Sequence, residues 1–281
     1  MYYIALMQLF ATLLALFLAW QAWGYFRRMW LWKKVQHRPL PPAIANTLKK
    51  IPHYRLLPDD LKRELHPRLL FFIETKQFMG VKIDVTDEMR ATIAFYACLM
   101  VLKIPDECFD NLVTILIYPY DVVAKQVEAE GGIYREGAFV LEGQSVADTV
   151  VIAWNEAKRQ AHHLWPHNVI VHELAHVLDF EDGMPDGVPP LQGALHRKWT
   201  QVLYRRFNDL KKKALANRDW GEYRIIGSYA AANEAEFFAV VSELFFQKPK
   251  TLKRHFPDIY DLLKSFYGLD TAAIFAELDE G

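Results

Sequence analysis

The sequence is poor in cysteine and has almost no net charge. Only two cysteines occur among 281 residues, Cys98 and Cys108. A fold stabilised by several disulfide bonds is therefore excluded, and buried reduced thiols are expected instead. Lys and Arg number 33 against 34 Asp and Glu, a formal net charge of -1. Because phosphate binding needs clustered positive charge, nucleic acid is not expected as a direct ligand.

The first 26 residues, MYYIALMQLFATLLALFLAWQAWGYF, lack Asp, Glu, Lys, Arg and His altogether. This length is sufficient for a helix to cross a hydrocarbon core of about 30 Å. A cleaved signal peptide would begin with basic residues and end at a small-residue cleavage site, whereas this segment does neither and runs into RRMWLWKK. We expect residues 1–26 to be retained in the lipid bilayer as an anchor. The alternative is a buried N-terminal helix of a soluble protein.

The charges that follow this segment predict its orientation. No acidic residue occurs before Asp59. Basic residues occur at Arg27, Arg28, Lys33, Lys34 and Arg38. Tryptophans suited to the membrane interface occur at Trp20, Trp23, Trp30 and Trp32. Because positive charge stays on the cytoplasmic side, we expect a single-pass protein of the inner membrane with a cytoplasmic C-terminal domain.

The chain divides into three parts by composition. Residues 1–36 form the transmembrane anchor and its basic juxtamembrane segment. Residues 37–52, HRPLPPAIANTLKKIP, contain four prolines and are expected to form a linker. Residues 53–281 have the composition of one globular domain, and no internal repeat is found.

Hydrophobic periodicity predicts an α+β domain that is mainly helical with a small β-sheet. Helices are expected at residues 57–78, 86–103, 167–180, 195–217, 233–247 and around 259–268. Strands are expected at residues 112–119 and 149–154, with a hairpin at 131–143 and a short strand or turn at 81–85.

The stretch VIVHELAHVLDFEDG, from Val169 to Gly183, carries the clearest chemical signal. On a helix, positions four residues apart lie one above the other, so His172 and His176 can bind one zinc ion. Glu173 can then act as general base by taking a proton from a metal-activated water. Two core histidines in a buried helix are the alternative interpretation.

Zinc needs a third protein ligand, and two carboxylates are candidates. Asp182 follows His172 by ten residues, as in enzymes whose chain turns back sharply after the motif helix. That turn favours glycine at position 179, where this chain has Asp179. Glu236 lies on an apolar predicted helix, where a lone carboxylate would be costly to bury unless it were paired or bound to metal. Glu236 is therefore the better candidate.

The segments HELAHVLDFEDG and SYAAANEAEFFAVVSELFF together resemble the Mlc titration factor A family of zinc peptidases. The catalytic region of that family is similar to the toxin protease lethal factor. The resemblance extends upstream through GVKIDVTDEMRATIAFYACLMVL and LEGQSVADTVVIAW. It implies a zincin-like fold, a Zn²⁺ site of His172, His176 and Glu236, and Glu173 as the catalytic base. It also implies that Tyr229, seven residues before Glu236, supports the transition-state oxyanion.

Other polar residues are assigned smaller roles. Asp179 or Glu243 could orient a ligand imidazole, or each could be a plain surface carboxylate. The segment 149–154 could receive an extended peptide at its edge, unless both of its sides are paired. Three histidines that precede the motif helix are expected to be solvated: His162, His163 and His167.

Three functions remain open from the sequence. The first is a membrane-anchored zinc peptidase, for which the resemblance implies aminopeptidase-type activity. The residues themselves do not separate removal of N-terminal residues from internal cleavage. The second is a regulatory protein that sequesters a partner such as a repressor of the Mlc type, with hydrolysis incidental. The third is an inactive relative of a peptidase, which the intact set of ligands and base argues against.

Overall fold

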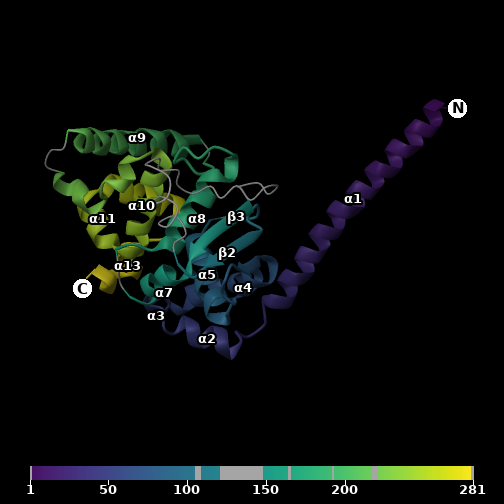
Figure 1. Ribbon diagram of the computed structural model, residues 1–281, viewed down its shortest axis with the longest axis horizontal. Coiled ribbons are helices and arrows are strands. Elements are labelled where there is room, and N and C mark those ends of the chain that lie inside the picture. Colours follow the sequence, from purple (N-terminus) through teal and green to yellow (C-terminus); the bar gives the residue numbers. More distant parts are fainter. Residues whose placement is uncertain are drawn as a thin grey trace.

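In the computed structural model, the described residues are 2–104, 109–120, 148–163, 166–191, 193–216 and 220–279. Helices dominate these ranges and accompany one small sheet, which confirms the expected α+β class (Figure 1). The α-helices are α1 (Tyr2–Val35), α2 (Pro42–Leu48), α3 (Pro52–Leu56), α4 (Asp59–Thr75), α5 (Asp87–Met100), α7 (Trp154–His162), α8 (Val169–Asp179), α9 (Gly193–Leu215), α10 (Glu234–Gln247), α11 (Pro249–His255), α12 (Pro257–Tyr267) and α13 (Thr271–Ile274). The strands are β1 (Gln77–Gly80), β2 (Thr114–Tyr118) and β3 (Thr149–Ala153).

The sheet has the order β1-β2-β3, and both pairs are parallel. The expected strands at residues 112–119 and 149–154 are confirmed as β2 and β3. The segment 81–85, expected to be a short strand or turn, forms bends at 81–83. The strand β1 lies just before it, and its first two residues were assigned to the end of the preceding helix. Parallel pairing with β2 satisfies the backbone of 77–80, and the chain then turns at Gly80 so tightly that a side chain would clash with the carbonyl oxygen of Ile83. The hairpin expected at 131–143 lies outside the described residues.

Helix α8 lies between the sheet and α10, which is buried along almost its whole length. It packs on β3 on one side and on α10 on the other, and α5 also contacts it. In α10 every residue from Ala235 to Gln247 is buried. The motif helix is therefore held on several sides by apolar packing, which fixes the positions of its side chains.

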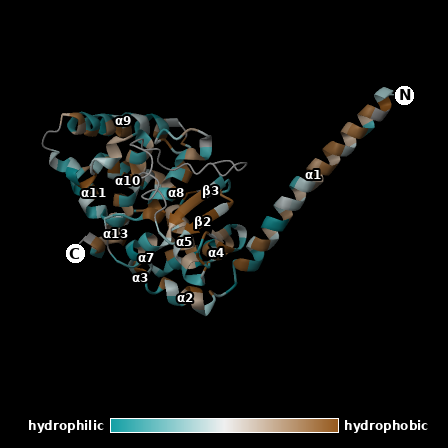
Figure 2. Ribbon diagram, in the orientation of Figure 1, coloured by the Kyte–Doolittle hydropathy of each residue, from teal (hydrophilic) through white to brown (hydrophobic). Residues whose placement is uncertain are grey.

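Helix α1 projects from the domain, with its N-terminal end far from the remaining helices (Figure 1). In Figure 2 the brown of hydrophobic residues predominates in its outer part, with paler and teal bands between. It has the length and composition of a membrane span, and none of its most apolar 18-residue window is buried. The other end is docked on the domain. Val35 is fully buried, Trp32 packs edge-on against Phe71 with ring centroids 5.6 Å apart, and Arg28 pairs with Asp110 at 2.6 Å.

Residues 42–56, which overlap the predicted linker, are folded against the domain. Pro42 and Pro52 occupy the first turns of α2 and α3, where a missing backbone N–H costs nothing. Leu48 and Ile51 are fully buried, and α2 packs on α5. The prolines that indicated a linker therefore begin two short helices.

Candidate metal centre

The first turn of α8 is fixed by Asn168. Its side-chain oxygen accepts hydrogen bonds from the backbone N–H groups of Ile170 at 3.1 Å and Val171 at 3.3 Å. Its own backbone N–H donates to the Glu243 carboxylate of α10 at 2.6 Å. An N-cap that is tied to the neighbouring helix places the following residues of α8, including His172, in a defined position against α10.

Three side chains from α8 and α10 meet at one point. The Nε2 atoms of His172 and His176 lie 3.2 Å apart. Nε2 of His172 lies 3.1 Å from Oε2 of Glu236, and Nε2 of His176 lies 3.2 Å from Oε1 of the same carboxylate. Glu236 is in the first turn of α10, where its backbone N–H donates to the capping side chain of Asn233 at 2.8 Å.

This donor set fits a zinc ion. A tetrahedral zinc with bonds of about 2.0–2.1 Å holds its donor atoms about 3.3 Å from one another, close to the separations between these three groups. Within the described part of the chain, His172, His176 and Glu236 are the group of three or more potential ligands that could hold a metal ion. Two imidazoles and one carboxylate leave a fourth position open for water or substrate.

The charges of these groups are strongly coupled. Burial lowers the pKa of His172, but hydrogen bonds to the Glu236 and Glu243 carboxylates together outweigh this effect and raise the pKa to about 10. Burial raises the pKa of Glu236, but its two histidine partners outweigh this and hold it well below its usual range. Without a metal, these directions favour a protonated His172 beside an ionised Glu236, and a divalent cation would displace that proton.

Glu173 and Tyr229 lie beside this group. Burial raises the pKa of Glu173, and the neighbouring His172 and His176 oppose that rise. Tyr229 is in a short 3₁₀ helix, Tyr229–Ala231, that packs on α10. Its ring centroid lies 5.9 Å from that of His172, and the residue is 41% exposed. The structure thus brings all five residues of the predicted site together.

The two carboxylates considered for orienting an imidazole have different surroundings. Glu243 is buried, and its Oε1 lies 2.7 Å from Nδ1 of His172, on the side of the ring opposite Nε2. Asp179 is also buried, and its Oδ2 accepts a hydrogen bond from the backbone N–H of Gly187 at 2.9 Å. Glu243 therefore contacts the His172 imidazole, whereas Asp179 holds the loop that follows the motif helix.

The chain does not turn back at position 179. Asp179 has helical dihedral angles, φ -64° and ψ -35°, and a 3₁₀ turn continues from Phe180 to Asp182. The turn ends at Gly183, whose φ of 90° is the left-handed conformation that favours glycine. The side chain of Asp182, the alternative third ligand, lies outside the described residues.

Of the three histidines before α8 that were expected to be solvated, His163 and His167 are exposed, but the expectation was wrong for His162, whose side chain is only 15% exposed. His167 is more than half exposed, yet its Nδ1 lies 3.6 Å from Oε2 of Glu243. The nearby Glu243 carboxylate raises the pKa of His167, although burial opposes this. His162 and His163 line a separate hollow. The N-cap role of Asn168 was missed, although an Asn directly before an apolar periodic run is its usual signal.

Comparison with known proteins agrees with this geometry. The family model described as glucose-regulated metallo-peptidase M90 matches residues 26–268. An uncharacterized protein of Synechocystis sp. is 33% identical over 257 residues, which cover 88% of this chain and 92% of the relative. Proteins named Mlc titration factor A are similar as well. The one from Edwardsiella ictaluri is 32% identical over 83% of this chain and 87% of its own length, and the one from Serratia proteamaculans is 29% identical over 87% and 94%.

Proposed function

Since the chain belongs to the glucose-regulated metallo-peptidase M90 family, we propose that it is a zinc-dependent peptidase whose metal ligands are His172, His176 and Glu236. The family supports a metal-dependent peptidase, and the zinc and its ligands are our assignment. The observation that carries the assignment is the meeting of two imidazoles and one carboxylate with separations of 3.1 to 3.2 Å. Membership also agrees with the resemblance in the sequence.

In the proposed hydrolysis, each side chain around this group has a separate role. A bound zinc would polarise a peptide carbonyl and lower the pKa of a water molecule toward neutrality. Glu173, whose pKa is raised by burial, takes the proton from that water and passes it to the leaving amine. The hydroxyl of Tyr229 donates a hydrogen bond to the developing oxyanion.

Glu243 acts on this chemistry through His172. Its carboxylate accepts the Nδ1–H of the imidazole at 2.7 Å, which leaves the lone pair of Nε2 directed toward Glu236 and the metal position. The same carboxylate accepts the backbone N–H of Asn168, so one buried group fixes both the ring and the start of its helix. This arrangement supports a preorganised ligand rather than one that is assembled by the metal.

A peptide substrate can be held along β3. In the part of the chain that the structure describes, β3 pairs with β2 along one side, and α8 packs on it. An extended peptide could therefore add to the other side of β3 and pass the metal group. Aminopeptidase-type cleavage is the mode that the resemblance implies, and it needs recognition of a free amino terminus as well.

We assign the catalytic domain to the cytoplasmic face of the inner membrane. The exposed apolar length of α1 supports a single span over residues 1–26. Arg27 and Arg28 directly follow this segment, and Lys33 and Lys34 occupy the last turn of the helix. Basic residues at this end support retention of the C-terminal part in the cytoplasm.

A regulatory role is the second candidate function. It rests on the relatives named Mlc titration factor A, which match over most of their own length. In this alternative the domain binds a repressor of the Mlc type or another protein, and hydrolysis is incidental.

The replacement Glu173→Gln tests the peptidase. It keeps the size of the side chain and removes the general base, so we expect cleavage of a peptide library to fall by about 10²–10⁴-fold while zinc content stays unchanged. Mass spectrometry of the products also separates removal of N-terminal residues from internal cleavage. Glu277→Gln, an exposed position near the C-terminus, is the matched control. Full cleavage by Glu173→Gln would refute the assigned base, and a regulatory phenotype that survives it would favour the binding role.

A further inference from the structure

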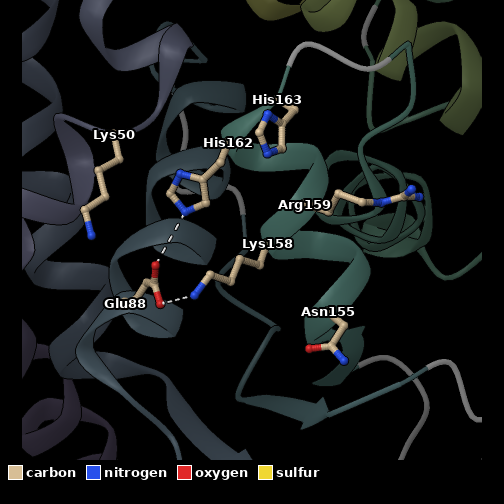
Figure 3. A pocket seen from close by; sticks show the side chains of 7 residues that line it. All are labelled: Lys50, Glu88, Asn155, Lys158, Arg159, His162 and His163. Carbon is tan, nitrogen blue, oxygen red and sulfur yellow. Dashed lines mark hydrogen bonds and ion pairs between the residues drawn. The ribbon is translucent and has the colours of Figure 1, made fainter.

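A hollow of about 470 Å³ lies beside α7, apart from the metal group (Figure 3). All seven residues that line it have polar or charged side chains. The lining residues are Lys50, Glu88, Asn155, Lys158, Arg159, His162 and His163. Five of them come from α7 and the residue directly after it, one from the turn after α2, and one from the first turn of α5.

The residues from α7 and its end form one continuous stripe. Asn155, Lys158, Arg159 and His162 have the spacing i, i+3, i+4, i+7, which places them on a single helix face, and His163 follows directly with extended backbone. At about 1.5 Å per residue, the helical part of the stripe is about 10 Å long. It is much longer than a single phosphate or carboxylate group, so an extended ligand would use its length better than a compact one.

The opposite wall contains a carboxylate, Glu88, that already contacts residues of the stripe. Glu88 stands between Lys50 and α7 (Figure 3). Its Oε2 lies 2.8 Å from Nζ of Lys158, and its Oε1 lies 3.6 Å from Nε2 of His162. Lys158 and His162 are four residues apart, so one carboxylate reaches two successive positions of the stripe.

Positive charge exceeds negative charge in this hollow. Two lysines and one arginine line it together with one carboxylate, Glu88, and Arg159 also pairs with Glu156 at 2.6 Å, although the whole chain has a formal net charge of -1. Lys50 is exposed, and no carboxylate of the described residues forms an ion pair with it. The excess is therefore a local feature of this surface and would attract an anionic ligand.

The position of the hollow favours a soluble ligand over a lipid surface. In Figure 1, α7 lies on the side of the domain away from the N-terminal end of α1. Helix α7 is also joined to the metal-binding helix, because the backbone N–H of Val169 donates to the side chain of Gln160 at 2.6 Å. A polypeptide held along α7 would therefore lie close to the start of α8.

We propose that this hollow, which we call the α7 groove, binds an extended acidic segment of a polypeptide. One acidic side chain of the segment would take the place of Glu88 at Lys158, and a neighbouring one would reach Lys50 on the opposite wall. In an extended chain, side chains two residues apart point the same way and are about 6.6 Å apart, so both could come from one strand. This binding does not depend on zinc or on catalysis.

Fluorescence anisotropy of a labelled hexaglutamate peptide tests the groove, with the full-length protein in uncharged detergent at low salt. Lys50→Ala removes an exposed cation, so we expect the dissociation constant to rise about two- to fivefold. Glu88→Gln removes the competing carboxylate and releases Lys158, so it should lower the dissociation constant by a similar factor. Lys212→Ala, on an exposed part of α9, makes the same change of net charge as Lys50→Ala and should have little effect.

Four outcomes would overturn the proposal. The first is no binding of hexaglutamate at low salt. The second is equal weakening by Lys50→Ala and Lys212→Ala, which would mean general attraction to a positive surface. The third is failure of Glu88→Gln to strengthen binding. The fourth is displacement of the peptide by equimolar inorganic phosphate, which would make the hollow a site for a compact anion.

Discussion

Helices α1 and α10 are both strongly apolar, yet they occupy opposite environments. The apolar part of α1 is exposed along its length, whereas α10 is buried from Ala235 to Gln247. The first 26 residues contain no carboxylate, and α10 contains two buried ones, Glu236 and Glu243. Apolar content alone therefore does not separate a membrane span from a core helix. The two buried carboxylates distinguish α10 from α1, because each carboxylate needs hydrogen-bond partners that only a folded domain supplies.

The partners of the two glutamates come from the same helix. A buried carboxylate without compensation costs several kcal/mol, so its hydrogen bonds must be satisfied. Glu243 bonds to the His172 ring and to the backbone of Asn168. Glu236 lies against His172 and His176. Helix α10 is thus tied to α8 by charge as well as by packing, and α1 has no comparable group to satisfy.

Removing a carboxylate from α10 should have the largest effect. In Glu236→Gln, a neutral amide replaces a ligand charge, so we expect zinc affinity to fall by more than about 100-fold and cleavage to be lost. Metal analysis of the purified protein and titration with zinc measure this. Glu234→Gln, two residues earlier on the same helix, is the matched control. Normal zinc binding in Glu236→Gln combined with loss in Asp182→Asn would instead make Asp182 the third ligand.

Adding a charge to α1 is the complementary experiment. In Leu14→Arg, a guanidinium lies near the centre of the proposed span, at a cost of about 2.5–3.5 kcal/mol. We expect the membrane-bound fraction to fall markedly in a flotation assay while zinc content is unchanged. Met29→Arg, next to Arg28 at the basic end of the helix, should leave the membrane-bound fraction unchanged. Full membrane retention of Leu14→Arg would argue that α1 does not span the bilayer.

Glu243→Gln should have a smaller effect than Glu236→Gln. An amide at this position still fits beside His172 but holds the ring less firmly, so we expect a loss of about 10–100-fold in zinc affinity. Competition with a chelator of known affinity measures the change, and Glu277→Gln serves as the control. A loss as large as that of Glu236→Gln would show that Glu243 does more than orient the imidazole.

The parts of the site that follow from helix periodicity were predictable, and those that depend on tertiary contacts were not. The spacing of His172 and His176 places both imidazoles on one side of a helix whatever surrounds it. Glu236 was favoured because a lone carboxylate on an apolar helix would be costly to bury without a partner, and the family resemblance supported it and added Tyr229. The sequence distance of about 60 residues carries no geometric information by itself. The link between Glu243 and Asn168 joins two helices and left no local signal.

Two features of the fold were likewise not predictable from the sequence, because they depend on tertiary contacts. Strand β1 at Gln77–Gly80 continues an apparently helical pattern, and only the distant β2 makes it a strand. Pro42 and Pro52 are compatible with a linker and with the first turn of a helix. The choice depends on Leu48 and Ile51, whose burial against α5 could not be seen from the spacing of the prolines.

Helix α1 runs without interruption from its exposed apolar part to Val35, which is buried in the domain. A domain on a flexible tether explores a volume that grows with the length of the tether. A continuous helix removes that freedom. With α1 in the bilayer as proposed, the domain would stay at one height above the lipid and turn mainly about the helix axis. A polypeptide would then be cut where it passes at that height, so distance from the membrane would select the bond before any side chain is recognised.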